Sequence, residues 1–450
     1  MNGYDLAYAF GLAVASPVWL LRERSRRKVL SALRLRGGRV PESDSAGPVV
    51  MIHAVSVGEI NATPALVRLL RNARPDLHVV ISVTTETGRD RGFQLYEAAP
   101  NVRVVRYPVD FSAAVVRALE AVRPDVVVLM ELELWPNFLR ECERRGIPTI
   151  LANGRLTTKS YRNYRRAGLV TRSMFRRLTV ACVQDDQYAQ RFIDCGVPAD
   201  RVRVLGTMKF DTAQIADNLA GAREVGDALG LTPGREPIWV CGSTGPGEEQ
   251  VILGVYRELL RKLPRLRLVL VPRHPQRFDE VADLIEDMKF ALVLRSNPTL
   301  PRDPVIPPVI LGDTMGELRL FYSLADVVFV GRSLVDLGPS QHGSDMIEPA
   351  ALGRPVIVGP HTGNFADAVR KFKAADALIE VTDAAALGET VAVLLGTPGE
   401  AQKMGRRAQT VVLREQGATV RHAQVVFQQL NQKLARRDET SRKSESHEIS

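Results

Sequence analysis

Residues 48–66, PVVMIHAVSVGEINATPAL, predict a buried strand, a glycine turn and a helix in direct succession. The apolar run at 49–52 is typical of a parallel strand covered on both faces, and apolar residues return at helical spacing after Gly58. In an open α/β sheet, the carboxyl end of a strand faces the ligand crevice. Glu59 stands at this junction. Two interpretations follow: a catalytic carboxylate, or a charge that only stabilises the helix N-terminus through the helix dipole.

The same strand-helix alternation continues along the chain and predicts two doubly wound, Rossmann-like α/β domains, at residues 47–222 and 236–400. Predicted strands of the first are 49–53, 78–83, 102–107, 126–130, 149–152, 181–184 and 202–206. Those of the second are 238–242, 267–272, 291–294, 309–311, 327–330 and 355–358. Residues 401–435 predict one long C-terminal helix, and residues 436–450 a polar, disordered tail.

Composition limits the classes of function. A chain of 450 residues with 45% hydrophobic and 25% charged residues is a folded protein of more than one domain. Its net charge of +9 favours an anionic partner: nucleic acid, an acidic membrane surface or a phosphorylated substrate. The four cysteines are scattered and no histidines cluster, so neither a zinc site nor a disulfide framework is indicated.

The N-terminus predicts a membrane-active segment. Residues 4–21 are almost wholly apolar, and arginines and a lysine crowd residues 22–28. A signal peptide has the opposite order, with basic residues before its apolar run. We therefore predict a membrane anchor with a basic juxtamembrane segment over residues 1–36, and a polar linker over 37–47. The alternative is an apolar helix packed on the following domain.

Further charged residues lie where the pattern places strand ends and a helix surface. Glu131 follows the apolar run at 126–129 and should share the crevice of Glu59, whereas Glu133 is interpreted as a helix-start charge. Arginines crowd residues 162–177, which suits nucleic acid or phosphate. No helix-turn-helix, zinc finger or RNP motif accompanies them, so a phosphorylated lipid is the better match to a membrane-active chain. The segment GSTGPGEE at 242–249 offers backbone amides to a phosphate but is not a Walker loop.

Seven motifs, in order along the chain, resemble those of the 3-deoxy-D-manno-octulosonic acid (Kdo) transferases of lipopolysaccharide biosynthesis. They are HAVSVGE at 53–59, ELELWPN at 131–137, NGRL at 153–156 with Ser160 and Tyr164, GTMKFD at 206–211, PRHP at 272–275, DTMGEL at 313–318 and EPA at 348–350. The resemblance implies a GT-B glycosyltransferase, in which two Rossmann-like domains face a cleft.

The resemblance also implies roles for residues. Glu59 resembles the catalytic base, and Glu131 and Lys209 resemble residues that stabilise the transition state. Residues matching the site for the donor, cytidine monophosphate (CMP)-Kdo, are Ser243, Thr244, Pro272, Arg273, Met315, Gly316, Glu317, Ser333, Asp345, Met346, Ile347 and Glu348. The motifs imply no metal and no cofactor besides this donor substrate.

Two stretches depart from the family pattern. Gly245 stands where the family usually has histidine. Where the family reads roughly GGSLVPxGGHNPLEPA, residues 331–350 read GRSLVDLGPSQHGSDMIEPA, about four residues longer and with Asp345 in place of asparagine. An aspartate beside the donor phosphate would repel it, so Asp345 is expected to turn toward the ribose or the base.

These observations predict an inverting enzyme at the cytoplasmic face of the inner membrane. It would move Kdo from CMP-Kdo to a phosphorylated lipid A precursor (lipid IVA), with membrane lipids and no nucleic acid as further partners. Two alternatives remain open: a GT-B transferase that uses a UDP-sugar, and a non-catalytic basic membrane adaptor.

Overall fold

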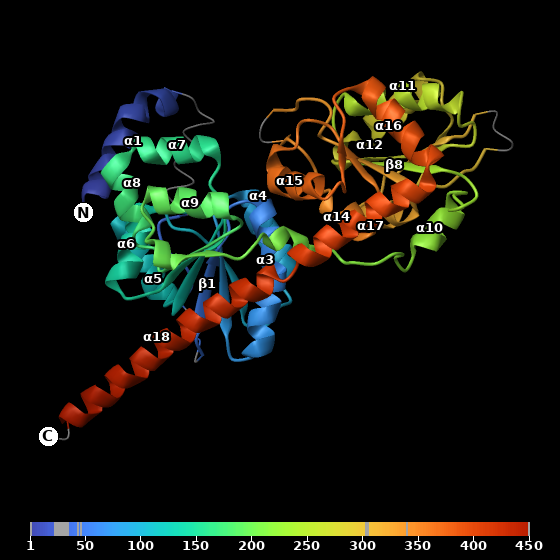
Figure 1. Cartoon of the computed structure of the whole chain (residues 1–450). Helices are drawn as coiled ribbons and strands as arrows, with labels where there is room; N and C mark the ends of the chain where they lie inside the picture. The colour runs from blue at the N-terminus through green and yellow to red at the C-terminus, as the bar shows by residue number, and fades with distance from the viewer. Residues whose placement is uncertain are drawn as a thin grey trace. The chain divides into compact units, whose positions relative to one another are not determined.

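The computed structural model describes residues 2–21, 36–42, 45, 47–301, 306–338 and 341–448, and it divides the chain into two compact units. The N-terminal unit comprises residues 1–212 and 417–450, and the C-terminal unit comprises residues 213–416. Both are parallel sheets covered by helices (Figure 1). The basic juxtamembrane segment predicted at residues 22–35 lies outside the described residues.

The N-terminal sheet has seven parallel strands in the order β3-β2-β1-β4-β5-β6-β7. They are β1 (Val49–His53), β2 (His78–Val83), β3 (Val102–Arg106), β4 (Val126–Met130), β5 (Thr149–Gly154), β6 (Val180–Val183) and β7 (Val202–Val204). All seven were predicted, within two residues at each end. The chain builds outward from β1 through β3 and then restarts at β4 on the other side of β1. The crevice between the carboxyl ends of β1 and β4 is therefore the topological switch point, where such sheets bind ligands.

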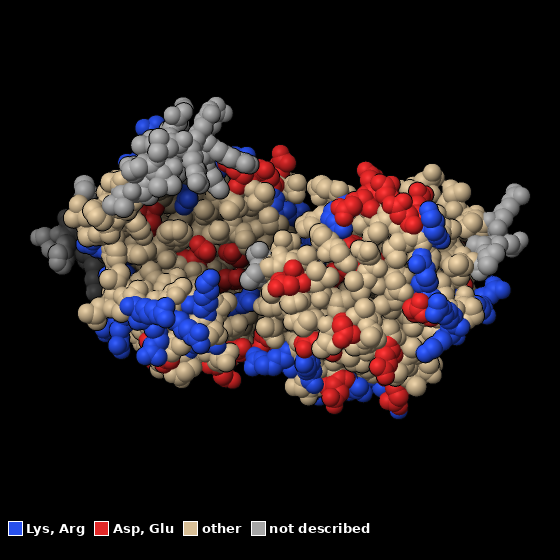
Figure 2. Space-filling model, turned by 90° about the horizontal axis from the view of Figure 1, so that it is seen from above, with Lys and Arg blue, Asp and Glu red and all other residues tan. Residues whose placement is uncertain are grey.

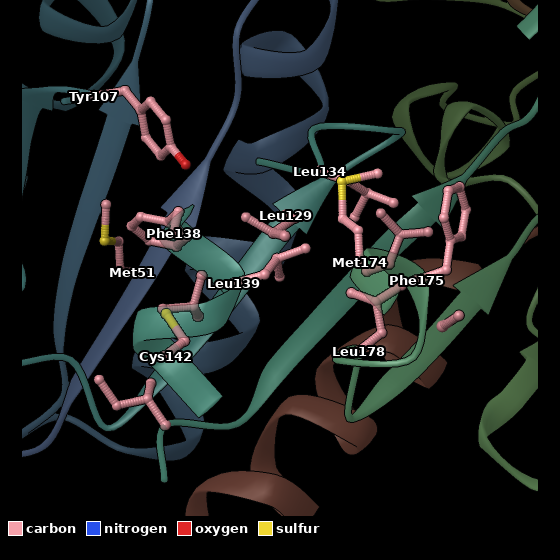
Figure 3. Close-up of a cluster of buried hydrophobic side chains, with 14 of the residues drawn as sticks. Met51, Tyr107, Leu129, Leu134, Phe138, Leu139, Cys142, Met174, Phe175 and Leu178 are labelled. Carbon is pink, nitrogen blue, oxygen red and sulfur yellow. The ribbon is translucent and has the colours of Figure 1, made fainter. Parts of the chain in front are cut away.

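Alternate side chains of these strands enter two hydrophobic cores, as a parallel sheet covered on both faces requires. Met51 and Leu129 face the core formed with helices α5, α6, α8 and α9, which Figure 3 shows around Phe138 and Phe175. Val50 and Val128 face the other core, which includes residues of α3 and α18. The helices of this unit are α1 (Gly3–Leu21), α3 (Val57–Ala73), α4 (Glu86–Tyr96), α5 (Ser112–Val122), α6 (Pro136–Arg144), α7 (Thr158–Arg166), α8 (Gly168–Phe175), α9 (Asp186–Cys195) and α18 (Ala418–Glu448), with short 3-10 turns η1 (Ala199–Arg201) and η2 (Met208–Thr212).

Helix α1 is fixed to the N-terminal unit by polar contacts at its start. Asp5 is 3% exposed, and its carboxylate accepts hydrogen bonds from the Ser112 backbone N–H (2.9 Å) and the Asn137 side chain (3.1 Å). The Tyr8 hydroxyl donates to Asp110 (3.0 Å), which also caps the start of α6. Among the described helices, none combines the length and the apolar character that crossing a bilayer requires. The first turns of α1 are thus packed on the N-terminal unit, which was the alternative to the predicted membrane anchor.

The C-terminal sheet is also parallel, in the order β10-β11-β9-β8-β12-β13-β14. Its strands are β8 (Ile238–Thr244), β9 (Arg267–Pro272), β10 (Leu292–Leu294), β11 (Val309–Leu311), β12 (Val327–Val330), β13 (Val356–Val358) and β14 (Ile379–Glu380). The two-residue β14 was not predicted, because so short a strand has no periodicity to detect. Here the switch point lies between β8 and β12.

Helices of the C-terminal unit are α10 (Ala222–Ala228), α11 (Glu248–Leu260), α12 (Phe278–Asp287), α13 (Leu318–Leu324), α14 (Ile347–Ala351), α15 (Ala366–Ala374), α16 (Ala384–Gly396) and α17 (Pro398–Glu415), with 3-10 turns η3 (Pro275–Arg277) and η5 (Gly363–Phe365). One core of this unit joins α11, α12, α16 and α17 to the sheet.

The single C-terminal helix predicted at 401–435 is two helices, and this prediction was wrong. α17 ends at Glu415 and α18 begins at Ala418, because Gly417 adopts a left-handed φ of 91° that interrupts the helix. α17 belongs to the C-terminal unit, whereas α18 returns to the N-terminal unit and packs against α3 (Figure 1). α18 also continues to Glu448, through most of the predicted disordered tail. Helix-favouring Arg, Lys and Glu residues in that segment are consistent with its extension.

Candidate active site

Glu59 lies in the first turn of α3, directly beyond the carboxyl end of β1. Ser56 is the N-cap of this helix and its hydroxyl donates to Glu59 Oε1 at 2.9 Å. The Val55 backbone N–H donates to the other carboxylate oxygen, Oε2, at 2.9 Å. These contacts form a variant of the capping box, in which a serine and a glutamate three residues later satisfy the free donors of a helix start. Glu59 therefore does stabilise the start of α3, as the helix-start interpretation states, and this role does not exclude a catalytic one.

The environment of Glu59 also suits a base. The side chain is only 8% exposed, and burial is the main cause that raises its pKa to about 7, against the lowering effect of the Val55 hydrogen bond. The nearby charges of Glu131 and Glu133 raise the pKa further. A general base works best when its pKa lies near the operating pH. Glu59 is thus poised to exchange a proton at neutral pH.

Glu131 occupies the corresponding position after β4, on the other side of the switch point. Its backbone has a φ of 51°, a left-handed conformation that costs a non-glycine residue about 1–2 kcal/mol. Its N–H donates to the Ala152 carbonyl at 2.9 Å, which holds this turn against β5. Strain of this kind concentrates at functional sites. The charge of Glu131 contributes to the raised pKa of Glu59, which is consistent with the prediction that the two carboxylates share one crevice.

Glu133 turns away into a half-buried environment. The Trp135 indole N–H donates to its Oε2 at 3.1 Å, and His53 Nε2 approaches the same oxygen at 3.9 Å. Burial lowers the pKa of His53 to about 3, so the ring is neutral and the approach is no ion pair. The helix-start interpretation of Glu133 was wrong: α6 begins at Pro136 with no acidic residue in its first turn, and Glu133 instead accepts from the indole of Trp135.

Lys209 lies in η2, which packs against α3 and α18. The turn is held by Asn153, whose side-chain oxygen accepts from the Met208 N–H at 3.1 Å. Asn153 is buried, and its own N–H donates to His422 Nε2 of α18 at 3.0 Å. His422 in turn donates from Nδ1 to the Ala418 carbonyl at 2.7 Å, so the contacts fix a neutral ring whose pKa is lowered chiefly by burial.

His422 was missed in the sequence analysis. It belongs to a helix far along the chain, and only the return of α18 to the N-terminal unit reveals its contact.

A basic and apolar surface lies on α7 and α8. Arg162, Arg166, Arg172 and Arg176 are exposed and form no ion pair with any other described residue. In Figure 2, Lys and Arg side chains gather on the N-terminal unit, in the left half of the view. Two apolar side chains between these arginines, Leu169 and Val170, are 85% and 58% exposed. Uncompensated arginines beside exposed apolar groups suit an amphipathic anion.

In the C-terminal unit, one buried carboxylate organises the switch point. Glu248, at the start of α11, is fully buried and accepts four backbone hydrogen bonds. Its Oε2 accepts from Gly245 (2.9 Å) and Arg332 (2.6 Å), and its Oε1 from Ser333 and Leu334 (2.8 Å each). The loop after β8 and the loop after β12 are thereby fixed to a single side chain. The sequence analysis gave Glu248 no role, although it quoted the segment GSTGPGEE that contains this residue.

The residues matched to the donor site divide into two groups by exposure. Arg273 and Met315 are exposed at the carboxyl ends of β9 and β11, and Gly316 has a φ of 88°, which leaves its backbone open. In contrast, the Ser333 hydroxyl is fully buried between the Val330 carbonyl (2.6 Å) and the Gly359 N–H (2.8 Å). The other buried members are Ser243, Thr244, Pro272, Met346 and Ile347. Side chains of this second group shape the loops.

Two of the three acidic residues of the predicted donor site, Glu317 and Asp345, already have hydrogen-bond partners. Glu317 accepts from Arg295 at 2.8 Å and from Thr314. Asp345 accepts from the N–H of Ile347, the first residue of α14, at 2.8 Å, and this helix carries Glu348. Burial, and then the charge of Asp345, raise the pKa of Glu348. The charge of Asp345 therefore influences the protonation of Glu348, the residue matched to the ribose.

Within the described ranges, one group of side chains has the composition of a metal site. Asp336, His342 and His361 offer ligand atoms that all lie within 4.8 Å of one another. His342 Nε2 and Asp336 Oδ1 are 2.7 Å apart, a hydrogen bond that pins the long loop after β12 without any ion. This hydrogen bond explains why Asp336 and His342 lie close together.

Comparison with known proteins decides the family. A sequence model described as 3-deoxy-D-manno-octulosonic-acid transferase (kdotransferase) matches residues 31–212. The 3-deoxy-D-manno-octulosonic acid transferase of Haemophilus influenzae is 36% identical over 375 residues, which are 83% of this chain and 85% of that protein. This chain belongs to the Kdo transferase family.

The Kdo transferase of Bordetella pertussis extends the match to 93% of this chain and 96% of its own, at 35% identity over 430 residues. Among solved structures, a glycosyltransferase from Rickettsia africae shares the fold with a TM-score of 0.56 at 14% identity, covering 86% of this chain and 99% of that one. The predicted GT-B class is confirmed, and the chain is a glycosyltransferase.

Proposed function

We propose that this Kdo transferase moves Kdo from CMP-Kdo to a phosphorylated lipid A precursor, with inversion at the anomeric carbon. The observation that carries the proposal is Glu59, a buried carboxylate with a pKa near 7 beside the β1/β4 switch point. In the proposed reaction the acceptor hydroxyl gives its proton to Glu59 while its oxygen attacks the anomeric carbon. The bond from that carbon to the phosphate oxygen breaks, and CMP leaves with the electron pair.

The other residues support this displacement. We assign to Lys209 and Glu131 the stabilisation of charge that develops as the bond to CMP breaks, since preorganised charges act most strongly in a water-poor site. Arg273 neutralises the donor phosphate, and Glu348 binds the ribose. Met315 and Gly316 offer backbone groups to the cytosine.

We place the enzyme at the cytoplasmic face of the inner membrane. Two surfaces support this placement: α1, where Leu6 and Phe10 are 59% and 72% exposed, and the arginines of α7 and α8 with Leu169 and Val170. Arginine forks suit the phosphates of the acceptor, while exposed apolar side chains suit its acyl chains or the bilayer interface.

The purified protein, supplied with CMP-Kdo and lipid IVA, should release CMP and form a product whose mass counts the Kdo residues added. UDP-sugars serve as the alternative donors. Transfer from a UDP-sugar and not from CMP-Kdo would contradict the donor assignment. Binding to acidic vesicles that persists without any transfer, and without any effect of nucleotides on the melting temperature, would identify a membrane adaptor instead.

A further inference from the structure

Arg332 is held in a backbone conformation that its residue type disfavours. It is the second residue after β12 and has a φ of 57°. Glycine adopts this left-handed region freely, whereas a side chain makes it costly. The family pattern has glycine here, in the pair GG where this chain has Gly331 and Arg332. A function for the guanidinium would explain why arginine stands at this position.

The guanidinium of Arg332 forms no ion pair with any described residue, and the one carboxylate that raises its pKa, Glu248, is already occupied by four backbone N–H groups. In the part of the chain that the structure describes, no group accepts a hydrogen bond from it, and its Nε is buried without a partner. Burial, and then the positive charge of Arg273, lower the pKa of Arg332. Burial, and then the charges of Arg332, Arg273 and Arg277, lower the pKa of His274. Three basic side chains thus share one region at the carboxyl ends of β9 and β12, next to the switch point between β8 and β12.

The second departure from the family pattern lies directly beside the first. A Cβ atom added at Gly245 would lie 3.0 Å from Arg332 Cγ and 2.6 Å from Leu337 Cδ1. A histidine at position 245, as in the family pattern, would therefore collide with these side chains. The chain has lost a basic side chain after β8 and gained one after β12, in the same space.

We propose that Arg332 binds the phosphate of the CMP donor together with Arg273, in the space that a histidine at position 245 occupies in the family. This inference rests on the proposed donor. The positive charges of the two guanidinium groups repel each other, and a phosphate would offset that repulsion while accepting their hydrogen bonds. Arg332 is thus a donor-binding residue particular to chains with this paired exchange.

The variant Arg332→Gly restores the family residue and separates binding from structure. It should bind CMP about 10- to 100-fold more weakly, the loss expected for a charge-assisted hydrogen bond, in a calorimetric titration. Its affinity for cytidine, which has no phosphate, should stay unchanged. Its melting temperature should rise by about 2–4 °C, because strain is relieved. Lys289→Gly is the matched control: Lys289 is exposed with a φ of 62°, so this variant should gain stability and keep its affinity for CMP.

Equal binding of CMP by Arg332→Gly and the parent would overturn the inference, as would an equal loss of affinity for CMP and cytidine. A parent protein that binds no CMP would overturn the proposed donor as well. The double variant Gly245→His with Arg332→Gly should recover part of the lost affinity for CMP, whereas Gly245→His alone should unfold at a lower temperature. A double variant no better than Arg332→Gly would show that the two positions do not exchange one role.

Discussion

Replacing Glu59 by glutamine separates its role as a base from its role in stability. The variant should transfer more slowly than the parent but be more stable than the parent at neutral pH. Glutamine keeps the shape and one acceptor oxygen for the N–H of Val55, but it cannot ionise. Folding raises the pKa of Glu59 from 4.5 to about 7, so the folded parent protein resists losing this proton. A carboxyl group with a raised pKa gives stability that is fully present below pH 4.5 and is lost as the pH rises through about 7.

The magnitude follows from the size of the shift. Each pKa unit corresponds to about 1.4 kcal/mol, so ionising buried Glu59 costs the parent up to about 3 kcal/mol above neutral pH. Glu59→Gln escapes this cost. The difference in unfolding free energy between variant and parent should therefore grow in favour of the variant between pH 4.5 and 7 and level off above. Over the same range the transfer rate of the parent should rise as Glu59 loses its proton.

Urea melts over this pH range and transfer rates at neutral pH, on one preparation, test the reasoning. Turnover of Glu59→Gln should fall by a factor of about 100 to 10,000, which is what a positioned general base contributes. Glu224→Gln, a first-turn glutamate exposed on α10, is the control and should keep both its turnover and its pH profile. Turnover of Glu59→Gln within a few-fold of the parent would refute the base. A stability difference independent of pH would refute the buried, neutral carboxyl.

Three further outcomes are expected. CMP should raise the melting temperature of the parent but hardly that of Arg273→Ala, because a ligand stabilises only the form that binds it; equal shifts would place the nucleotide elsewhere. Leu6→Ser with Phe10→Ser should weaken sedimentation with anionic vesicles and leave the melting temperature within about 1–2 °C, since both side chains are exposed; unchanged sedimentation would exclude α1 from the membrane contact. Glu248→Gln should destabilise the C-terminal unit by about 2–4 kcal/mol in calorimetry, because two of the four backbone donors must face an amide N–H, whereas exposed Glu258→Gln should change little.

The strands and the positions of Glu59 and Glu131 were predictable because both depend on local pattern. A short run of β-branched residues followed by a glycine or a polar turn marks a strand and its carboxyl end wherever it occurs. The side chains of Ser333, Met346 and Ile347, in contrast, were matched to the donor by motif and are buried in the structure. A motif gives the order of residues but not the direction in which each side chain points.

The contacts that could not be predicted join segments that are far apart in sequence. Glu248 organises residues 84 or more positions away, and His422 reaches Asn153 across 269 positions. The exchange between Gly245 and Arg332 also becomes visible only when the loops after β8 and β12 lie side by side.

The return of α18 has a consequence for synthesis. Ala423, Val425, Val426 and Leu430 of this helix are buried in the core of the N-terminal unit, against the face of the sheet that carries Val50 and Val128. The C-terminal unit is continuous in sequence, from residue 213 to residue 416, whereas the N-terminal unit is not. Because a ribosome makes the chain from its N-terminus, residues 1–212 must wait with one face of their sheet incompletely covered until the last helix emerges. The half of the protein that is made first is therefore the half that finishes folding last, and nascent chains stalled before residue 417 should expose it to chaperones.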